Sequence, residues 1–198
     1  MAATPVIVQL RHGPFWNFSY VVGVPGAEAL VIDPAWDTPA IHAAASEHDM
    51  RITGAAVTHG HHDHAHGLAE LVERTGATVF AHEAEAALVA ETFGGRVTTI
   101  EHGARVLLGP LRVRFLHTPG HTPGSIALHV GEHVFTGDTL TTAGRGRHGA
   151  YEGAAAQLDC SLTRVLTALA PETAMYPGHD SGPARSAVLG DVLARARR

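Results

Sequence analysis

The chain has 198 residues, of which 45% are hydrophobic and 17% are charged, and its formal net charge is -5. This composition excludes a wholly disordered chain, and the length predicts one domain over residues 1–198. The acidic balance argues against a nucleic-acid partner. Cys160 is the single cysteine, which excludes a disulfide framework and a cysteine-based zinc cluster. The 16 histidines point to metal chemistry instead.

The beginning of the sequence resembles neither a secretion signal nor a membrane anchor. Residues 1–13 show no basic stretch followed by an apolar core and a small-residue cleavage site. The longest apolar runs, such as 29–32, are far shorter than the roughly 20 residues that a membrane helix needs. We therefore expect a cytoplasmic protein without a membrane partner.

Short runs of β-branched and aromatic residues alternate with alanine-rich runs along the chain. The first kind predicts strands at 6–10, 19–24, 29–33, 54–58, 78–81, 112–117, 125–130, 133–136 and 174–176. The second kind predicts helices at 38–48, 65–75, 83–93, 154–170 and 183–196. Cys160 is expected to be a small core residue of the helix at 154–170. Because strands outnumber helices and several adjoin in sequence, the pattern favours an α/β fold with mixed sheets covered by helices.

Five titratable side chains crowd a segment that directly follows one of the predicted strands. The string Thr-His-Gly-His-His-Asp-His spans residues 58–64 and precedes a predicted helix. A loop does not force neighbours to opposite faces, so four of these side chains can turn toward one point: His59, His61, Asp63 and His64. A catalytic zinc ion takes three protein ligands and a water, with ligand distances of about 2.0–2.3 Å. Four ligands exceed one such site, so two metal ions are expected if further ligands arrive from elsewhere.

Three further candidate ligands follow other predicted strands. His121 lies in the string His-Thr-Pro-Gly-His-Thr-Pro-Gly, Asp138 in Phe-Thr-Gly-Asp, and His179 in Tyr-Pro-Gly-His-Asp. Binding and catalytic groups concentrate at such positions, where a rigid scaffold carries a loop. The first cluster alone could be a surface patch that binds metal without catalysis, but the three added positions favour a catalytic centre. His62 is expected to point away from it.

These motifs resemble the metallo-β-lactamase fold superfamily. The resemblance is carried by one string and four residues at strand ends: 58–64, Asp33, His121, Asp138 and His179. The strings around His121 and Asp138 look like the glyoxalase II branch, the hydroxyacylglutathione hydrolases. The stretches 144–153 and 176–180 are at least as similar to the persulfide dioxygenases.

The resemblance implies a four-layer αβ/βα sandwich of two mixed sheets flanked by helices. It also implies two divalent metal ions, zinc foremost and iron or manganese as alternatives. The implied ligands are His59, His61 and His121 for the first ion, Asp63, His64 and His179 for the second, and Asp138 between the two. In such a centre a metal-bound hydroxide attacks a thioester, and Asp63 orients the nucleophile and accepts its proton.

Several other residues are expected to support this centre. Asp33 and Thr58 would orient ligand histidines. We expect the substrate, a small thioester of a thiol carrier, to contact Arg145, Arg147, Tyr151 and Tyr176. The chain has no lysine to match those that contact glutathione in glyoxalase II, so the two arginines are the expected substitutes. The 19 residues after His179 suffice for one helix rather than for the C-terminal helical domain of that branch.

Other activities fit the same residues. A mononuclear iron persulfide dioxygenase would use His59, His121 and Asp138, which is the ligand pattern of non-haem iron sites with open positions. A lactonase or β-lactamase could use the whole centre, because a fold does not determine its substrate. The sequence leaves the acyl group, the thiol carrier and the formation of a homodimer open.

Overall fold

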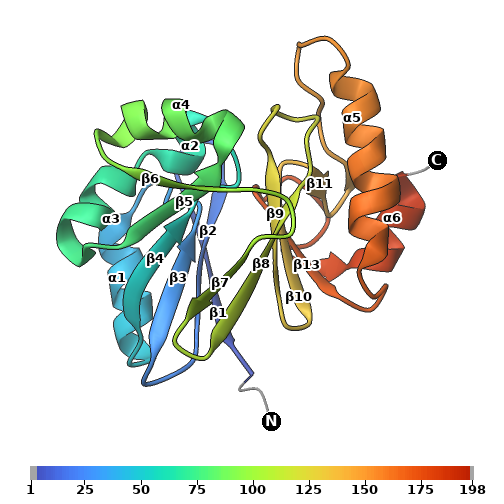
Figure 1. Ribbon diagram of the computed structural model, residues 1–198. Helices are drawn as coiled ribbons and strands as arrows, with labels where there is room; N and C mark the ends of the chain where they lie inside the picture. Colours follow the sequence, from blue (N-terminus) through green and yellow to red (C-terminus); the bar gives the residue numbers. More distant parts are fainter. Residues whose placement is uncertain (1–3, 197–198) are drawn as a thin grey trace.

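Two six-stranded sheets face each other, and helices cover the outer face of each (Figure 1). The computed structural model describes residues 4–196. The first sheet and its helices comprise, in chain order, β1 (Val6–His12), β2 (Asn17–Gly23), β3 (Glu28–Ile32), α1 (Thr38–Glu47), β4 (Arg51–Ala56), α2 (His62–Ala65), α3 (Leu68–Thr75), β5 (Thr78–His82), α4 (Glu83–Phe93) and β6 (Val97–Ile100). The second half comprises β7 (Arg105–Leu108), β8 (Leu111–His117), β9 (Ile126–Val130), β10 (His133–Gly137), β11 (Leu140–Thr141), β12 (Gly144–Arg145), α5 (Ala154–Cys160), β13 (Ala174–Pro177), β14 (Ala187–Val188) and α6 (Leu189–Ala196).

Both sheets are mixed. The first has the order β1-β2-β3-β4-β5-β6, with antiparallel pairing from β1 to β3 and parallel pairing from β3 to β6. The second has the order β14-β13-β10-β9-β8-β7, in which β10 and β13 are parallel and the other neighbours antiparallel. A ribbon of β11 and β12 stands beside it. These two mixed sheets flanked by helices confirm the predicted sandwich.

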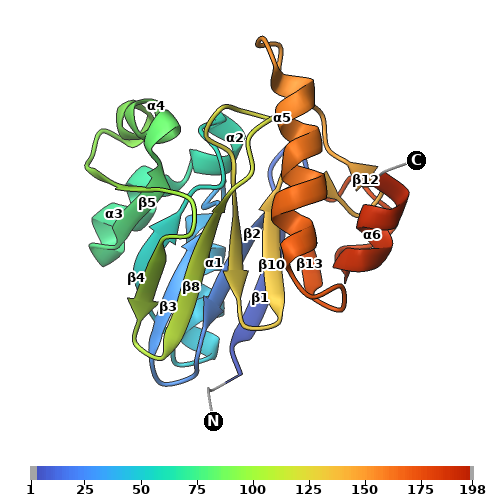
Figure 2. The same ribbon diagram turned by 45° about the vertical axis from the view of Figure 1, so that its right-hand side comes forward.

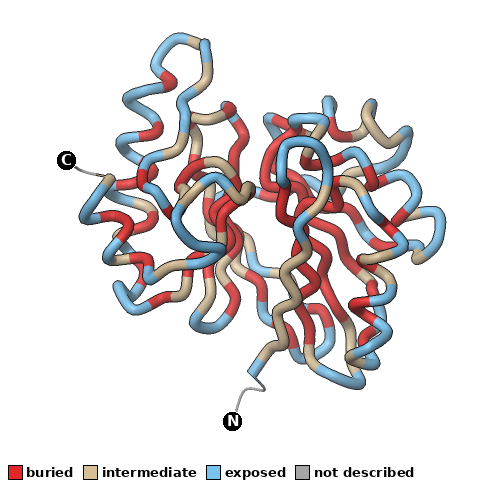
Figure 3. The backbone as a smooth tube through the Cα atoms, turned by 180° about the vertical axis from the view of Figure 1, so that it is seen from behind, coloured by how far each residue is buried: buried red, intermediate tan, exposed pale blue. Residues whose placement is uncertain are grey.

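Strand β2 illustrates how the sequence builds the layers. Its alternate residues Phe18, Tyr20 and Val22 lie in the core between the two sheets, whereas Val21 faces the core under the helices of the first sheet. All of β2 is buried, as expected for a strand covered on both faces. A third core joins the second sheet to α5 and α6 (Figure 2). Seen from behind, buried segments run through the sheets, while exposed ones follow the loops and outer helical turns (Figure 3).

The predicted helix at 183–196 is wrong in its first half. Helix α6 begins at Leu189, because Ala187 and Val188 form β14 and pair with Met175 and Ala174 of β13. Pairing with a distant strand overrides the local preference of this alanine-containing segment. The sequence also gave no sign of β14, β11 and β12, which have two residues each, or of β6 and β7, which have four.

The expectation that Cys160 lies in the core is also wrong, because its side chain is exposed. Leu158 is fully buried, and after Cys160 the helix continues as a π-helical turn over Ser161–Val165. Leu158, Ser161 and Leu162 follow the three- and four-residue spacing of one helical face, and Ser161 and Leu162 are 1% and 2% exposed. Cys160 is two residues from Leu158, so it lies on the opposite, solvent-facing side of the helix.

Within residues 4–196, no helix combines the length and the apolar character needed to span a bilayer.

Candidate metal centre

Seven polar side chains converge at one edge of the sandwich. The segments that carry them adjoin α2 of the first sheet and β11 of the second half, both labelled in Figure 1. The first sheet contributes the loop after β4 and the start of α2. The second sheet contributes the β8–β9 loop and the ends of β10 and β13. The structure thereby brings together all seven residues that the sequence selected as metal ligands: His59, His61, Asp63, His64, His121, Asp138 and His179.

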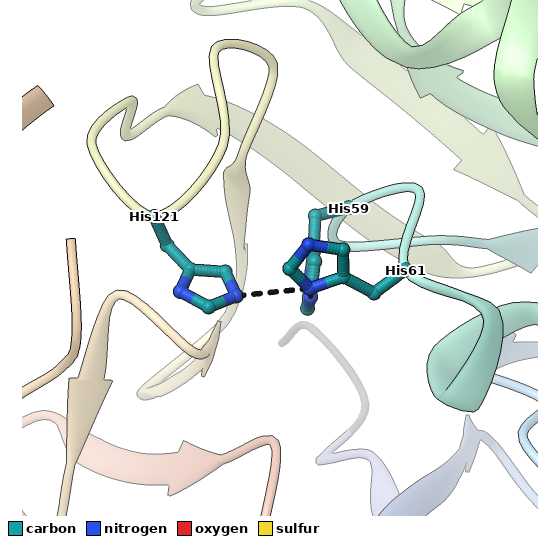
Figure 4. Close-up of side chains that lie close together, drawn as sticks. All are labelled: His59, His61 and His121. Carbon is teal, nitrogen blue, oxygen red and sulfur yellow. Dashed lines mark hydrogen bonds between the residues drawn. The ribbon is translucent and has the colours of Figure 1, made fainter. Parts of the chain in front are cut away.

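One group consists of three histidines (Figure 4). Nδ1 of His61 lies 3.0 Å from Nε2 of His59 and 3.1 Å from Nε2 of His121. Nitrogens at this spacing, each about 2.0–2.1 Å from a common ion, would subtend angles of about 95° at it. The three rings can therefore share one ion.

A second group consists of Asp63, His64 and His179. The Nε2 atoms of the two histidines are 3.1 Å apart, and Oδ2 of Asp63 lies 3.7 Å from that of His64 and 3.5 Å from that of His179. This set joins one end of α2 to the loop after β13. It offers two imidazoles and a carboxylate to one ion.

Asp138 lies between the two groups. Its Oδ2 is 3.5 Å from Nε2 of His121 in the first group and 3.4 Å from Nε2 of His179 in the second. Its Oδ1 is 3.7 Å from Nε2 of His64. One carboxylate therefore reaches toward ligands of both groups.

In four of the five histidines of the centre, a protein acceptor holds the outer ring nitrogen, Nδ1, whereas His61 turns its Nδ1 toward the centre. Nδ1 of His64 donates to Asp33 at 2.9 Å, and the hydroxyl of Thr58 donates to the same carboxylate at 2.7 Å. That hydroxyl accordingly accepts from Nδ1 of His59, at 3.1 Å. The rings of His121 and His179 donate to backbone carbonyls, that of His121 to Arg147 at 2.8 Å and that of His179 to Phe15 at 2.9 Å. Each bond leaves Nε2 unprotonated toward the centre in the neutral ring, as a metal ligand requires.

Sequence reasoning missed Asn17, which holds the carboxylate of Asp63. Its side-chain amide donates to Oδ2 of Asp63 at 3.0 Å, and its carbonyl oxygen accepts from Nε1 of Trp36 at 3.2 Å. Asn17 is fully buried and its backbone forms a bridge with His179. The sequence shows an asparagine just before a predicted strand, but it shows neither that Asn17 is buried nor that it bonds to Asp63.

Sequence reasoning also missed Glu85 of α4, which links the two loops of the first group. One carboxylate oxygen accepts from the backbone N–H of Gly60 and the other from that of Gly124, both at 2.9 Å. Gly60 lies between His59 and His61, and Gly124 follows His121 by three residues. Glu85 is 5% exposed, so these bonds are sheltered from water. In the sequence it is one of several glutamates of a helix, and nothing local distinguishes it.

The electrostatics of the cluster are those of a cation site. Burial disfavours the charged form of His64, but the surrounding carboxylates, foremost Asp138 and Asp33, outweigh burial and raise its pKa to about 9. Burial also opposes the charge on Asp138, yet His64 and the neighbouring histidines hold the pKa of that carboxyl well below its usual range. Burial, reinforced by His64, holds the pKa of His59 well below the ordinary value.

The residues present fit bound divalent ions. Lone pairs of several imidazoles and the oxygens of two carboxylates face one another here, and such an arrangement needs positive charge between its members. Imidazole and carboxylate are also the ligand types that zinc, iron and manganese accept. The charge can come from protons, as on His64, or from metal ions.

A cavity of about 390 Å³ opens onto this centre. Phe15, Arg145 and Arg147 line it together with three of the seven site residues, His121, Asp138 and His179. The guanidinium of Arg145 forms an ion pair with Asp159 and donates to the carbonyl of Ala155 at 3.0 Å, which fixes it to α5.

The two tyrosines expected to contact substrate lie outside this lining. The hydroxyl of Tyr151 donates to Gln157 at 3.0 Å. Tyr176 packs between the sheets, with its ring stacked on Phe135 at a centroid distance of 5.1 Å and its hydroxyl facing His133.

The fold and the site define an α/β sandwich with a His/Asp centre able to hold metal ions. Comparison with known proteins identifies the superfamily to which such a protein belongs. A model of the metallo-beta-lactamase superfamily matches residues 13–182. The chain is 37% identical over 180 residues to the hydroxyacylglutathione hydrolase of Pseudomonas aeruginosa. The aligned region covers 88% of this chain and 66% of that protein. It is 27% identical over 186 residues to the probable polyketide biosynthesis zinc-dependent hydrolase PksB of Bacillus subtilis, covering 93% and 82% of the two chains.

Solved structures give the same result. The crystal structure of ETHE1 from Myxococcus xanthus superposes with a TM-score of 0.86 at 34% identity, over 98% of this chain and 84% of that one. The chain belongs to the metallo-beta-lactamase superfamily, and it lies in the glyoxalase II-like and persulfide dioxygenase-like branch.

Proposed function

We propose that this chain is a metallo-hydrolase that cleaves a small thioester at a dinuclear centre. His59, His61 and His121 would hold one ion, Asp63, His64 and His179 the other, and Asp138 both. The observation that carries the proposal is the completeness of this set. Two three-ligand groups share an intervening carboxylate, and the outer nitrogens of four ligand rings are already bonded to protein acceptors.

Divalent ions would supply hydroxide at neutral pH, because they lower the pKa of water from 15.7 to about 7, and they would polarise the thioester carbonyl. The chain's own residues orient the reactants. Asn17 holds one oxygen of Asp63, so the carboxylate presents a fixed face to the centre, where it can accept the proton of the attacking water. Hydrolysis forms one carbon–oxygen bond, breaks the carbon–sulfur bond and leaves the proton on the released thiol.

Thioesters are favoured as substrates by the 37% identity to a hydroxyacylglutathione hydrolase. Arg147 is the natural contact for an anionic thiol carrier, because it lines the cavity and its backbone carbonyl already accepts from His121. Arg145 would act indirectly, since its guanidinium is engaged with Asp159 and can instead hold the β11–β12 ribbon against α5.

A mononuclear iron dioxygenase acting on a persulfide is the second candidate. It is supported by membership of this branch and by the proximity of two histidines and one aspartate. Asp138 lies 3.5 Å from His121, and its carboxylate also belongs to a group with His59. Two imidazoles and one carboxylate with open positions are the ligand set of oxygen-using iron sites.

Metal content decides between these candidates. The protein should be purified without chelator or affinity-tag metal, analysed for its elements and then assayed on thioesters, lactones and a persulfide. About two zinc ions per chain with thioester turnover would support the hydrolase. About one iron per chain with oxygen consumption on the persulfide would support the dioxygenase. A protein that takes up no metal would overturn both.

A further inference from the structure

Two further histidines form a pair just outside the centre, on the solvent side of α2. His62 and His66 are four residues apart, and His66 continues the helical conformation with φ -55° and ψ -42°. Both side chains are exposed. Residues four apart on a helix share a face, and two histidines with this spacing are a recurring zinc-binding arrangement.

The two rings have the spacing of the ring pairs within the centre. Nε2 of His62 and Nδ1 of His66 are 3.2 Å apart, compared with 3.0 to 3.1 Å for the pairs that face the centre. The ring centroids are 4.7 Å apart, between the 4.6 and 4.9 Å of those pairs. An ion about 2.0–2.1 Å from both nitrogens would be bound at an angle of about 103°, close to tetrahedral.

Trp36 packs against the pair. Its ring lies 4.3 Å from the ring of His66 and 6.2 Å from that of His62, measured between centroids. The indole N–H is itself fixed by Asn17, as described above. Packing against an anchored indole limits the freedom of the His66 ring, which reduces the entropy lost when a ligand binds.

We infer that His62 and His66 chelate one divalent transition-metal ion of the kind that imidazole ligands accept, such as zinc or nickel, with water completing its coordination. This third site is distinct from the seven-residue centre, because neither histidine belongs to its groups. Two protein ligands bind less tightly than three, so the site fills after the centre. The inference does not rest on the proposed function, since the pair would bind an ion whatever the centre catalyses.

The test compares zinc uptake by equilibrium dialysis in the unsubstituted protein, H62Q, H66Q and the control H48Q. His48 is a histidine at the end of α1, outside the pair and the centre. The unsubstituted protein and H48Q should bind one zinc ion more than H62Q or H66Q. Because the readout is a difference between variants, it stands even if the centre itself binds no metal. Equal uptake by all four proteins would overturn the inference.

Nickel quenching of tryptophan fluorescence provides a second readout, because the indole of Trp36 adjoins the pair. Protein given only enough zinc to fill the centre, which binds before the pair, should lose fluorescence on addition of nickel. H62Q should lose most of that response while keeping the contact between Trp36 and His66. If H62Q is quenched as strongly as the unsubstituted protein, the rings bond to each other without binding an ion, and the inference fails.

Discussion

Replacing Glu85 by glutamine should loosen the two loops that carry the three-histidine group. Each oxygen of the carboxylate accepts one backbone N–H at 2.9 Å, from Gly60 and from Gly124. Glutamine has one acceptor oxygen, so its NH₂ group would face an N–H donor at one of the two loops. A hydrogen bond to a charged group contributes about 1.5–3 kcal/mol, and its loss leaves a buried N–H without a partner.

We therefore expect E85Q to lower the free energy of unfolding by about 2–3 kcal/mol, measured by urea denaturation of metal-free protein. Zinc affinity should fall by roughly 10–100-fold, as for other residues that position metal ligands. It can be measured by titration against a competing chelator. The matched control is E91Q, which removes an exposed carboxylate from the same helix.

The two measurements separate positioning from simple stabilisation. A lower unfolding free energy with unchanged zinc affinity would mean that Glu85 stabilises the fold without positioning the ligands. If E85Q unfolds within about 0.5 kcal/mol of the unsubstituted protein and binds zinc equally well, the reasoning from the two 2.9 Å bonds is wrong.

Three further predictions concern the centre itself. D138A should lose metal retention and turnover together, with a rate loss above about 100-fold, and full activity with normal metal content would refute the shared-ligand role. N17A should keep its metal but lower kcat by about 10-fold, because Asp63 loses the donor that orients it; an unchanged kcat would exclude that role. The pKa of His64 is about 9 without metal, so an ion must displace its proton. Zinc affinity should therefore rise up to tenfold per pH unit from pH 7 to about 9 and then level off, and a flat profile over that range would contradict it.

The sequence could select the seven side chains that the structure brings together because the signals that mark them are local. A strand ends, glycine or proline marks the turn, and a histidine or aspartate follows, as at His121, Asp138 and His179. Each of these loops begins at the end of a strand of the second sheet, and the structure brings them to the same edge. The predicted strands and the loops that follow them were therefore enough to identify these residues, and the order of the strands in the sheets was not needed.

What the sequence could not predict depends on contacts between distant residues. The strand β14 exists because Ala187 and Val188 meet β13, and Glu85 matters because two glycines in other loops lie against it. Both outcomes are set by a neighbour far away in the chain, which periodicity does not carry. The exposure of Cys160 is different, because the spacing of the buried Leu158 and Leu162 already places it on the opposite face of the helix.

The division of the centre between the two sheets links metal supply to folding. His64 and His179 are 115 positions apart, so an intermediate with only the first sheet formed would present an incomplete ligand set. An ion that binds only the complete set stabilises the native state by RT ln(1 + [L]/Kd), and it does so across the seam between the sheets. Chelation would therefore do more than stop turnover. It would leave a protein whose two halves separate more readily along that seam, with faster hydrogen exchange and proteolysis in the loops that meet there.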